Sequence, residues 1–199
     1  MTVVIGLTGG IASGKSTVSS ILAEHGAAII NADEIGHQVL VPHSQLWQEV
    51  LSAFGKGIFL SNEEVNRQKL GEIVFNNPEA LKRLNQIMHP PMHRIVERKI
   101  ENLKKQGSGV IVLEAAVLLE AGWEPLVDEI WVTAAPETTV VQRLRNGKNF
   151  TESQALDRIY SQLPSEERMK RADVIINTDC DLSEVRARVE ELWKKLQGD

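Results

Sequence analysis

Five short segments of the chain are almost continuously apolar and rich in valine and isoleucine. Such runs are typical of strands in a parallel sheet covered on both faces, because neither face alternates with solvent. The predicted strands are Val3–Leu7, Ala27–Asn31, Val110–Glu114, Glu129–Thr133 and Asp173–Asn177. Amphipathic helical spacing follows the first, fourth and fifth of them, over Ser16–His25, Pro136–Arg145 and Leu182–Leu196. Strands that alternate with helices predict an α/β fold with a five-stranded parallel sheet.

A long stretch separates the second predicted strand from the third. Apolar residues within it recur at helical spacing, and the pattern is interrupted by Pro90-Pro91, so we expect a helix to end at His89. A structureless loop of this length is improbable in a compact domain. We therefore expect a helical insertion over 32–109, within a core made of 1–31 and 110–199. A second, strongly charged helical stretch over about 145–171 predicts a short lid.

Composition excludes several classes of protein. The 199 residues are 42% hydrophobic and 25% charged with a net charge of −5, which is typical of a globular domain and disfavours nucleic-acid binding. No apolar run approaches the ~20 residues that span a bilayer, so no membrane partner is expected. The N-terminus lacks the features of a signal peptide, and the single Cys180 forms no internal disulfide. These features predict a cytoplasmic protein.

Lysine and arginine concentrate in two parts of this acidic chain. Residues 61–110 and 140–171 hold more basic than acidic side chains, whereas residues 1–60 hold only two lysines. Two basic stretches suit a small polyanionic ligand better than a long polymer, although solvated helix faces give the same pattern.

A glycine-rich sequence after the first strand carries the most specific chemistry. Residues 9–16, Gly-Gly-Ile-Ala-Ser-Gly-Lys-Ser, match the phosphate-binding pattern G-x-x-x-x-G-K-[ST]. Its glycines let backbone N–H groups point at phosphate oxygens, and the following helix adds its positive end. Lys15 is expected to reach the β- and γ-phosphates, and Ser16 to bind Mg²⁺ that accompanies ATP. The expected ATP-binding residues of this loop are Ala12, Ser13, Gly14, Lys15, Ser16 and Thr17.

Three classes of nucleotide-binding protein share this loop. A GTPase would use Asp33 and Gly36 as its D-x-x-G switch, but no N-K-x-D sequence for base recognition follows. A transport or motor ATPase would show a strand ending in Asp-Glu, whereas the third strand ends in Glu114 before alanines. A small-molecule kinase has an insertion after its second strand and an arginine-rich lid after its fourth. The last class fits the pattern best.

Five segments, in order, resemble one family of small-molecule kinases, the dephospho-CoA kinases. They are Ile-Gly-Leu-Thr-Gly-Gly-Ile-Ala-Ser-Gly-Lys-Ser-Thr at 5–17, Asn-Ala-Asp at 31–33, His-Pro at 89–90 with Arg94 after it, Val-Leu-Glu-Ala-Ala-Val-Leu-Leu-Glu-Ala-Gly-Trp at 112–123, and Ala-Asp-Val-Ile-Ile-Asn at 172–177. The resemblance implies a three-layer phosphate-loop kinase core with a helical acceptor-binding insertion and a short lid. It further implies a monomer or weak homo-oligomer that transfers the ATP γ-phosphoryl group to the ribose 3′-hydroxyl of dephospho-CoA.

Candidate roles outside the loop follow from this resemblance and from position. Asp33 is the implied general base, although a strand-end carboxylate also caps helices. Arg143 and Arg145 are candidates for the transferred phosphoryl group and ATP, or else lie at a solvated helix end. Asn177 is a candidate for the adenine, or a turn residue. Glu114 is a candidate Mg²⁺ ligand through water, or simply ends a strand. Candidate acceptor-binding residues are Thr8, Asp33, His89, Arg94, Leu118 and Glu120.

The chain departs from the common pattern of the family at several positions. Ala12 replaces a frequent glycine, Asn31 a frequent aspartate, Glu114 an aspartate and Ala116 a proline. The expected second lid arginine is Gly147, flanked by Arg145 and Lys148. Two alternatives remain open at this point: a kinase for another small hydroxylated acceptor, such as a nucleoside monophosphate or shikimate, and a GTP-dependent switch.

Overall fold

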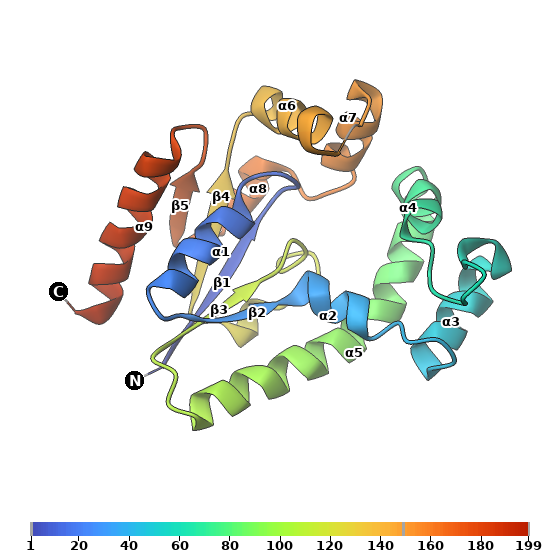
Figure 1. Cartoon of the computed structure of the whole chain (residues 1–199), viewed down its shortest axis with the longest axis horizontal. Coiled ribbons are helices and arrows are strands. Elements are labelled where there is room, and N and C mark those ends of the chain that lie inside the picture. The colour runs from blue at the N-terminus through green and yellow to red at the C-terminus, as the bar shows by residue number, and fades with distance from the viewer. Residues whose placement is uncertain (1, 149, 199) are drawn as a thin grey trace. The chain divides into compact units, whose positions relative to one another are not determined.

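The described residues, 2–148 and 150–198, form a five-stranded parallel sheet in the computed structural model. The strand order across the sheet is β2-β3-β1-β4-β5, so β1 lies at the centre (Figure 1). The strands are β1 Val3–Gly9, β2 Ala28–Asn31, β3 Val110–Glu114, β4 Glu129–Ala134 and β5 Val174–Asn177. All five predicted strands are confirmed, and their ends differ from the predicted ones by at most two residues. The α/β fold is therefore confirmed as well.

Helices occupy the intervals between the strands and the long stretch after β2. The α-helices are α1 Lys15–Glu24, α2 Ala32–Gln38, α3 Gln45–Phe54, α4 Arg67–Phe75, α5 Pro78–Lys105, α6 Glu137–Lys148, α7 Glu152–Tyr160, α8 Ser165–Met169 and α9 Leu182–Gln197. Two short 3₁₀ helices are η1 Lys56–Ile58 and η2 Glu124–Leu126. Among the described residues, no helix combines the length and apolar character that crossing a bilayer requires.

The chain divides into two compact units. One consists of residues 1–31 and 97–199 and contains the sheet; the other consists of residues 32–96. The sequence pattern placed the second boundary at 109, whereas the division in the structure falls after Val96, inside α5. A boundary within a continuous helix has no signal in the hydrophobic pattern, because the apolar stripe runs through it.

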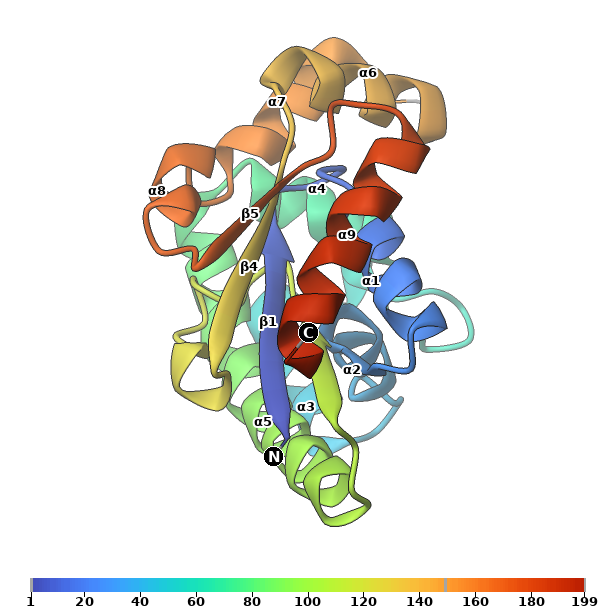
Figure 2. The same cartoon turned by 90° about the vertical axis from the view of Figure 1, so that its left-hand side faces the viewer.

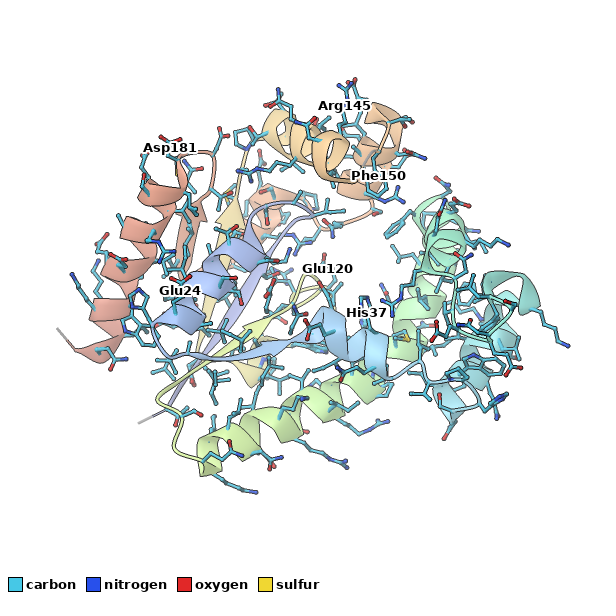
Figure 3. All side chains as sticks on the ribbon, viewed as in Figure 1. Glu24, His37, Glu120, Arg145, Phe150 and Asp181 are labelled. Carbon is cyan, nitrogen blue, oxygen red and sulfur yellow. The ribbon has the colours of Figure 1, made fainter. Side chains whose placement is uncertain are left out.

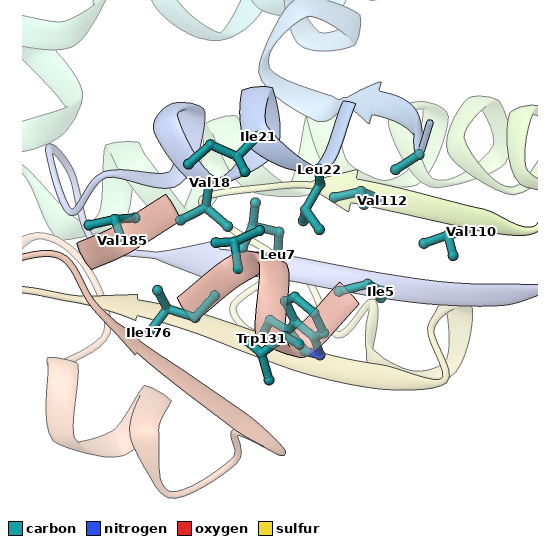
Figure 4. Packing of buried hydrophobic residues seen from close by; sticks show 13 residues of the cluster. Ile5, Leu7, Val18, Ile21, Leu22, Val110, Val112, Trp131, Ile176 and Val185 are labelled. Carbon is teal, nitrogen blue, oxygen red and sulfur yellow. The ribbon is translucent and has the colours of Figure 1, made fainter. Parts of the chain in front are cut away.

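The core of the sheet unit lies between the strands and the pair α1 and α9, which cover one face of the sheet (Figure 2). Alternate residues of β1, Ile5 and Leu7, point into this layer and are fully buried. Val18 and Leu22 of α1 meet them from above, and Trp131 of β4 closes the layer (Figure 4). This packing fixes β1 and α1 relative to each other, and thereby the loop that joins them.

The insertion unit contains one feature that the sequence predicted wrongly. The helix expected to end at His89 continues through Pro90-Pro91 to Lys105, as the single helix α5. Each proline removes a helical hydrogen bond and crowds the preceding turn, at a cost of about 3 kcal/mol. The compensation is a buried stripe at four-residue spacing that spans the prolines, made of Met88, Met92, Val96 and Ile100. Burial of this stripe outweighs the local preference.

Candidate active site

The loop between β1 and α1 is the best-defined part of the site, and its geometry requires glycine at two positions. A Cβ atom on Gly9 would lie 2.3 Å from Thr133 Oγ1 and 2.6 Å from the Thr133 carbonyl oxygen. Gly14 has a φ of +89°, and a Cβ there would lie 2.9 Å from the side chain of Thr178. The loop is thus pressed against the ends of β4 and β5. Only glycine permits this close approach.

The loop encloses a small cavity of about 280 Å³ at the N-terminus of α1. All six loop residues predicted to bind ATP line this cavity, and Arg143 from α6 lines it with them. The backbone N–H groups at the start of α1 and the helix dipole favour an anion at this place. The structure therefore brings together the predicted loop residues and one of the two predicted lid arginines.

The ammonium group of Lys15 lies folded back over the loop. Its Nζ donates hydrogen bonds to the carbonyl oxygens of Gly9, at 2.9 Å, and Gly10, at 3.0 Å. The side chain is largely buried although it carries a charge. A buried ammonium group bound by carbonyl dipoles is placed to exchange these contacts for phosphate oxygens, which are stronger acceptors.

Ser16 and Glu114 approach each other at the other side of the cavity. Ser16 Oγ donates a 3.2 Å hydrogen bond to Glu114 Oε1, and Glu114 is the last residue of β3, with 5% of its surface exposed. A hydroxyl group and a carboxylate, whose oxygen atoms can both ligate a metal ion, thus lie together beside the phosphate cavity. This pair has the donor chemistry that Mg²⁺ prefers.

Arg143 is held in place by the loop and by the end of β5. Its guanidinium donates to the carbonyl oxygen of Ala12, at 3.2 Å, and to both oxygens of Thr178. Thr178 Oγ1 in turn donates to the carbonyl oxygen of Ser13, at 2.8 Å. Arg143 lies in the middle of α6 rather than near its end, because the helix continues beyond the predicted Arg145. From this position its side chain reaches both the loop and the residue after β5.

Arg145 lies elsewhere. Its side chain is exposed, lies 3.9 Å from the carboxylate of Glu152 on α7, and does not line the phosphate cavity (Figure 3). Asn177 ends β5, and its Oδ1 accepts a 2.9 Å hydrogen bond from the N–H of Asp179, in the manner of a turn residue. The side chain of Lys148 lies outside the described part of the structure.

Three predicted acceptor-binding residues belong to the sheet unit and lie in or near β1. Leu118 is fully buried next to Gly6, which places its side chain in the core. Thr8 is also buried, and its hydroxyl accepts a 3.4 Å hydrogen bond from Arg168. Glu120, in the turn after β3, binds the guanidinium of Arg168 with both carboxylate oxygens (Figure 3). Nothing in the sequence pattern pointed to Arg168, which is 1% exposed.

The insertion unit holds the remaining predicted residues. Asp33 lies in the first turn of α2 and is exposed, so it is part of the helix rather than its N-cap. His89 and Arg94 are both on α5, five residues apart, which places them about 140° apart around the helix. His89 is half-buried and Arg94 is exposed. Helical spacing therefore puts His93, not Arg94, on the same side of α5 as His89.

His37, at the end of α2, has its electrostatic neighbours within the same unit. Partial burial, followed by the positive charge of Arg67, lowers the pKa of His37 below 6.5, against the opposing effect of Asp33 and Glu34. Arg67, the first residue of α4, is thus a cation within electrostatic range of His37. No motif in the sequence marks this arginine.

Comparison with known proteins gives one consistent result. The family model described as dephospho-CoA kinase matches residues 3–184. A protein named dephospho-CoA kinase from Carboxydothermus hydrogenoformans is 44% identical over 192 residues, which cover 96% of this chain and 93% of that protein. Among solved structures, TT1252 from Thermus thermophilus has a TM-score of 0.79 at 27% identity. A dephospho-CoA kinase from Campylobacter jejuni has a TM-score of 0.71 at 29% identity. Both alignments cover 98% of each chain.

Proposed function

This chain belongs to the dephospho-CoA kinase family, and we propose that it transfers the γ-phosphoryl group of ATP to the ribose 3′-hydroxyl of dephospho-CoA. The single observation that carries the proposal is the complete phosphate loop, with Lys15 and Arg143 at one cavity, in a chain whose nearly full length matches this family. The products are ADP and coenzyme A. The oxygen of the 3′-hydroxyl forms the new bond to phosphorus, and the bond from phosphorus to the β-phosphate oxygen breaks.

The loop supplies binding and charge neutralisation. The N–H groups of Ala12–Thr17 hold the phosphates, and Lys15 leaves the carbonyl oxygens of Gly9 and Gly10 to contact the β- and γ-phosphates. Arg143, fixed between Ala12 and Thr178, stabilises the charge on the transferred group. Preorganisation is the physical advantage, because the loop N–H groups and Arg143 are already oriented by the fold.

The oxygen atoms of Ser16 and Glu114 fit the Mg²⁺ that accompanies ATP. Mg²⁺ in such sites takes one or two protein ligands, with phosphate oxygens and water completing its shell. When bound, the ion neutralises part of the charge on the phosphates. Ser16 would ligate it directly, and Glu114 through water.

Asp33 is proposed as the base that takes the proton of the 3′-hydroxyl. Its position along the chain supports this role: it follows Asn31, which pairs with Glu114 in the sheet. Two Cα–Cα steps of 3.8 Å keep the Asp33 backbone within about 8 Å of the end of β2 in any orientation of the insertion. An exposed carboxylate tethered at the carboxyl edge of a parallel sheet is suited to act at a ligand there. Arg94 and His89 are proposed to bind the acceptor from α5.

An assay of ADP release tests the proposal. Dephospho-CoA is expected to raise ADP release well above the rate with ATP alone, and Lys15→Met is expected to abolish the increase. A panel with shikimate and nucleoside monophosphates in place of dephospho-CoA, and with GTP in place of ATP, measures selectivity. If dephospho-CoA gives no increase while another acceptor does, the substrate assignment is wrong and the kinase class stands.

Replacement of Asp33 separates binding from chemistry. Asp33→Asn is expected to bind ATP as the wild type does and to lower kcat by at least about 100-fold, the usual contribution of a general base. Glu34→Gln is the matched control, because Glu34 is the adjacent exposed acid in the same turn of α2. A kcat near the wild-type value in Asp33→Asn excludes Asp33 as the base.

A further inference from the structure

One peptide group of the phosphate loop, between Gly10 and Ile11, is held at both ends. Its carbonyl oxygen, on Gly10, accepts the 3.0 Å hydrogen bond from Lys15 Nζ. Its N–H group, on Ile11, donates a 2.8 Å hydrogen bond to Oε1 of Gln162. Gln162 lies 151 residues away along the chain, between α7 and α8. No motif in the sequence marks it.

The backbone next to Gln162 is itself bound by an ion pair that is buried on its arginine side. Leu163 donates its N–H to Glu120 Oε1 at 3.2 Å, and its carbonyl oxygen accepts from Arg168 Nε at 3.2 Å. Arg168 binds Glu120 as well and is 1% exposed. It also donates to the carbonyl oxygen of Ala116, at 3.0 Å. Both backbone groups of Leu163 therefore have hydrogen-bond partners, and these bonds hold the segment that carries the Gln162 side chain.

The hydrogen bond from Ile11 to Gln162 affects the whole peptide group between Gly10 and Ile11. A hydrogen bond accepted from the N–H of a peptide group polarises that group and strengthens the acceptor power of its carbonyl oxygen. Gln162 therefore fixes the plane of this peptide, whether its carbonyl oxygen contacts Lys15, as in the free protein, or Lys15 has moved to a phosphate. The adjoining Ala12 has a φ of +54°, which a residue other than glycine adopts at a cost of about 1 kcal/mol. Such a conformation persists only where surrounding contacts hold the backbone in place.

We propose that Gln162 is a positioning residue of the phosphate loop. It keeps the Gly10–Ile11 peptide, and with it the backbone of the loop, in the conformation that accepts a triphosphate. Only the kinetic part of its test rests on the proposed kinase function, since nucleotide binding by the loop can be measured without an acceptor.

Gln162→Met removes the acceptor oxygen and keeps the length of the side chain. Loss of one ordinary hydrogen bond lowers the equilibrium constant that favours the competent loop over a rearranged one by about fivefold. The apparent affinity falls in proportion to the competent fraction, and therefore by at most this factor. The KM for ATP and the Kd of a non-hydrolysable ATP analogue are therefore expected to rise by up to about fivefold. The kcat and the KM for dephospho-CoA are expected to stay within about twofold of wild type.

The Ile11 amide gives a readout in the free protein. Its proton resonance is expected to move upfield in Gln162→Met, because the hydrogen bond is lost. Gln162→Glu keeps an acceptor oxygen at the same place, and because a carboxylate accepts more strongly, the resonance is expected at or downfield of its wild-type position. Gln142→Met, which replaces an exposed glutamine on α6, is the matched control and is expected to change neither the shift nor the affinity.

Three results would overturn the proposal. The first is an unchanged analogue Kd and Ile11 shift in Gln162→Met. The second is a lowered kcat and melting temperature with unchanged KM values, which indicates general destabilisation. The third is an upfield shift of the Ile11 proton in Gln162→Glu. An inactive wild-type protein would contradict the proposed kinase function instead, and the analogue titration and the amide shift would still decide the role of Gln162.

Discussion

Removal of the Glu120 carboxylate is the perturbation whose consequence follows most directly from the structure. Glu120→Ala leaves the guanidinium of Arg168, which is 1% exposed, without its counter-charge. Glu120 itself is 22% exposed, so the pair is buried on the arginine side and reached by water on the other. The N–H of Leu163 also loses its acceptor. The substitution therefore removes the partner of a buried charge, on Arg168, and of a backbone N–H group, on Leu163.

The expected cost lies at the lower end of the range for such changes. Breaking a buried ion pair by removing one partner costs about 3–5 kcal/mol, because the remaining charge is uncompensated. Arg168 keeps three neutral acceptors, on Leu163, Ala116 and Thr8, and these soften the loss. We therefore expect about 3 kcal/mol of lost stability. At about 2–4 °C per kcal/mol for a protein of this size, the melting temperature falls by about 6–12 °C.

Urea unfolding and thermal melting of three variants measure this cost. Glu120→Gln keeps one acceptor oxygen and is expected to lose about 1–2 kcal/mol. Glu124→Ala is the matched control: it removes the partner of Arg171 in a surface ion pair, where the loss is expected to stay below about 1 kcal/mol. A loss in Glu120→Ala no larger than in this control would refute the reasoning that the pair is effectively buried.

The same variants test the sequence-based prediction that Glu120 binds the acceptor. If its role is to hold Arg168, the folded Glu120→Gln enzyme keeps a KM for dephospho-CoA within about twofold of wild type. If Glu120 contacts the acceptor, that KM rises by the factor of about tenfold or more that a lost hydrogen bond to a charged group produces. Measurement well below the melting temperature separates the two effects.

Three further predictions concern other parts of the chain. Gly9→Ala places a Cβ 2.3 Å from a hydroxyl oxygen of β4, so displacement of the loop should abolish binding of an ATP analogue; retained affinity in a calorimetric titration would contradict the packing. NMR titration of His37 should give a pKa below 6.5, and Arg67→Met should raise that pKa. Because the folded state lowers the pKa of His37, the folded protein is most stable with respect to this group above pH 6.5. That contribution to the free energy of unfolding falls as the pH drops through the folded pKa. Arg186 lowers the pKa of Glu24 below 4.5 through a hydrogen bond and its charge, so the stability from this exposed pair is present above pH 4.5 and lost at lower pH; unfolding at several pH values should show a weaker acid dependence in Arg186→Met.

The sheet and the loop could be predicted because each depends on residues close in sequence. Continuous valine and isoleucine runs specify strands buried on both faces, and the glycines around Lys15 specify the turn that follows β1. The end of a helix at His89 was predicted from an equally local rule and was wrong. There the stripe from Met88 to Ile100 stabilises α5 through tertiary burial, and a local rule contains no term for that energy.

The contacts that orient the loop could not be predicted, for a related reason. Gln162 and Arg168 carry no motif, and their partners Ile11 and Glu120 lie 151 and 48 residues away along the chain. A glutamine or arginine in a charged helical stretch is ordinarily solvated, so pattern analysis assigns it to the surface. Only the three-dimensional packing shows that one accepts a hydrogen bond from the phosphate loop and that the other is buried behind it. The residues that bind phosphate can therefore be predicted from a local motif, whereas the residues that hold the loop in its binding conformation become apparent only in the folded structure.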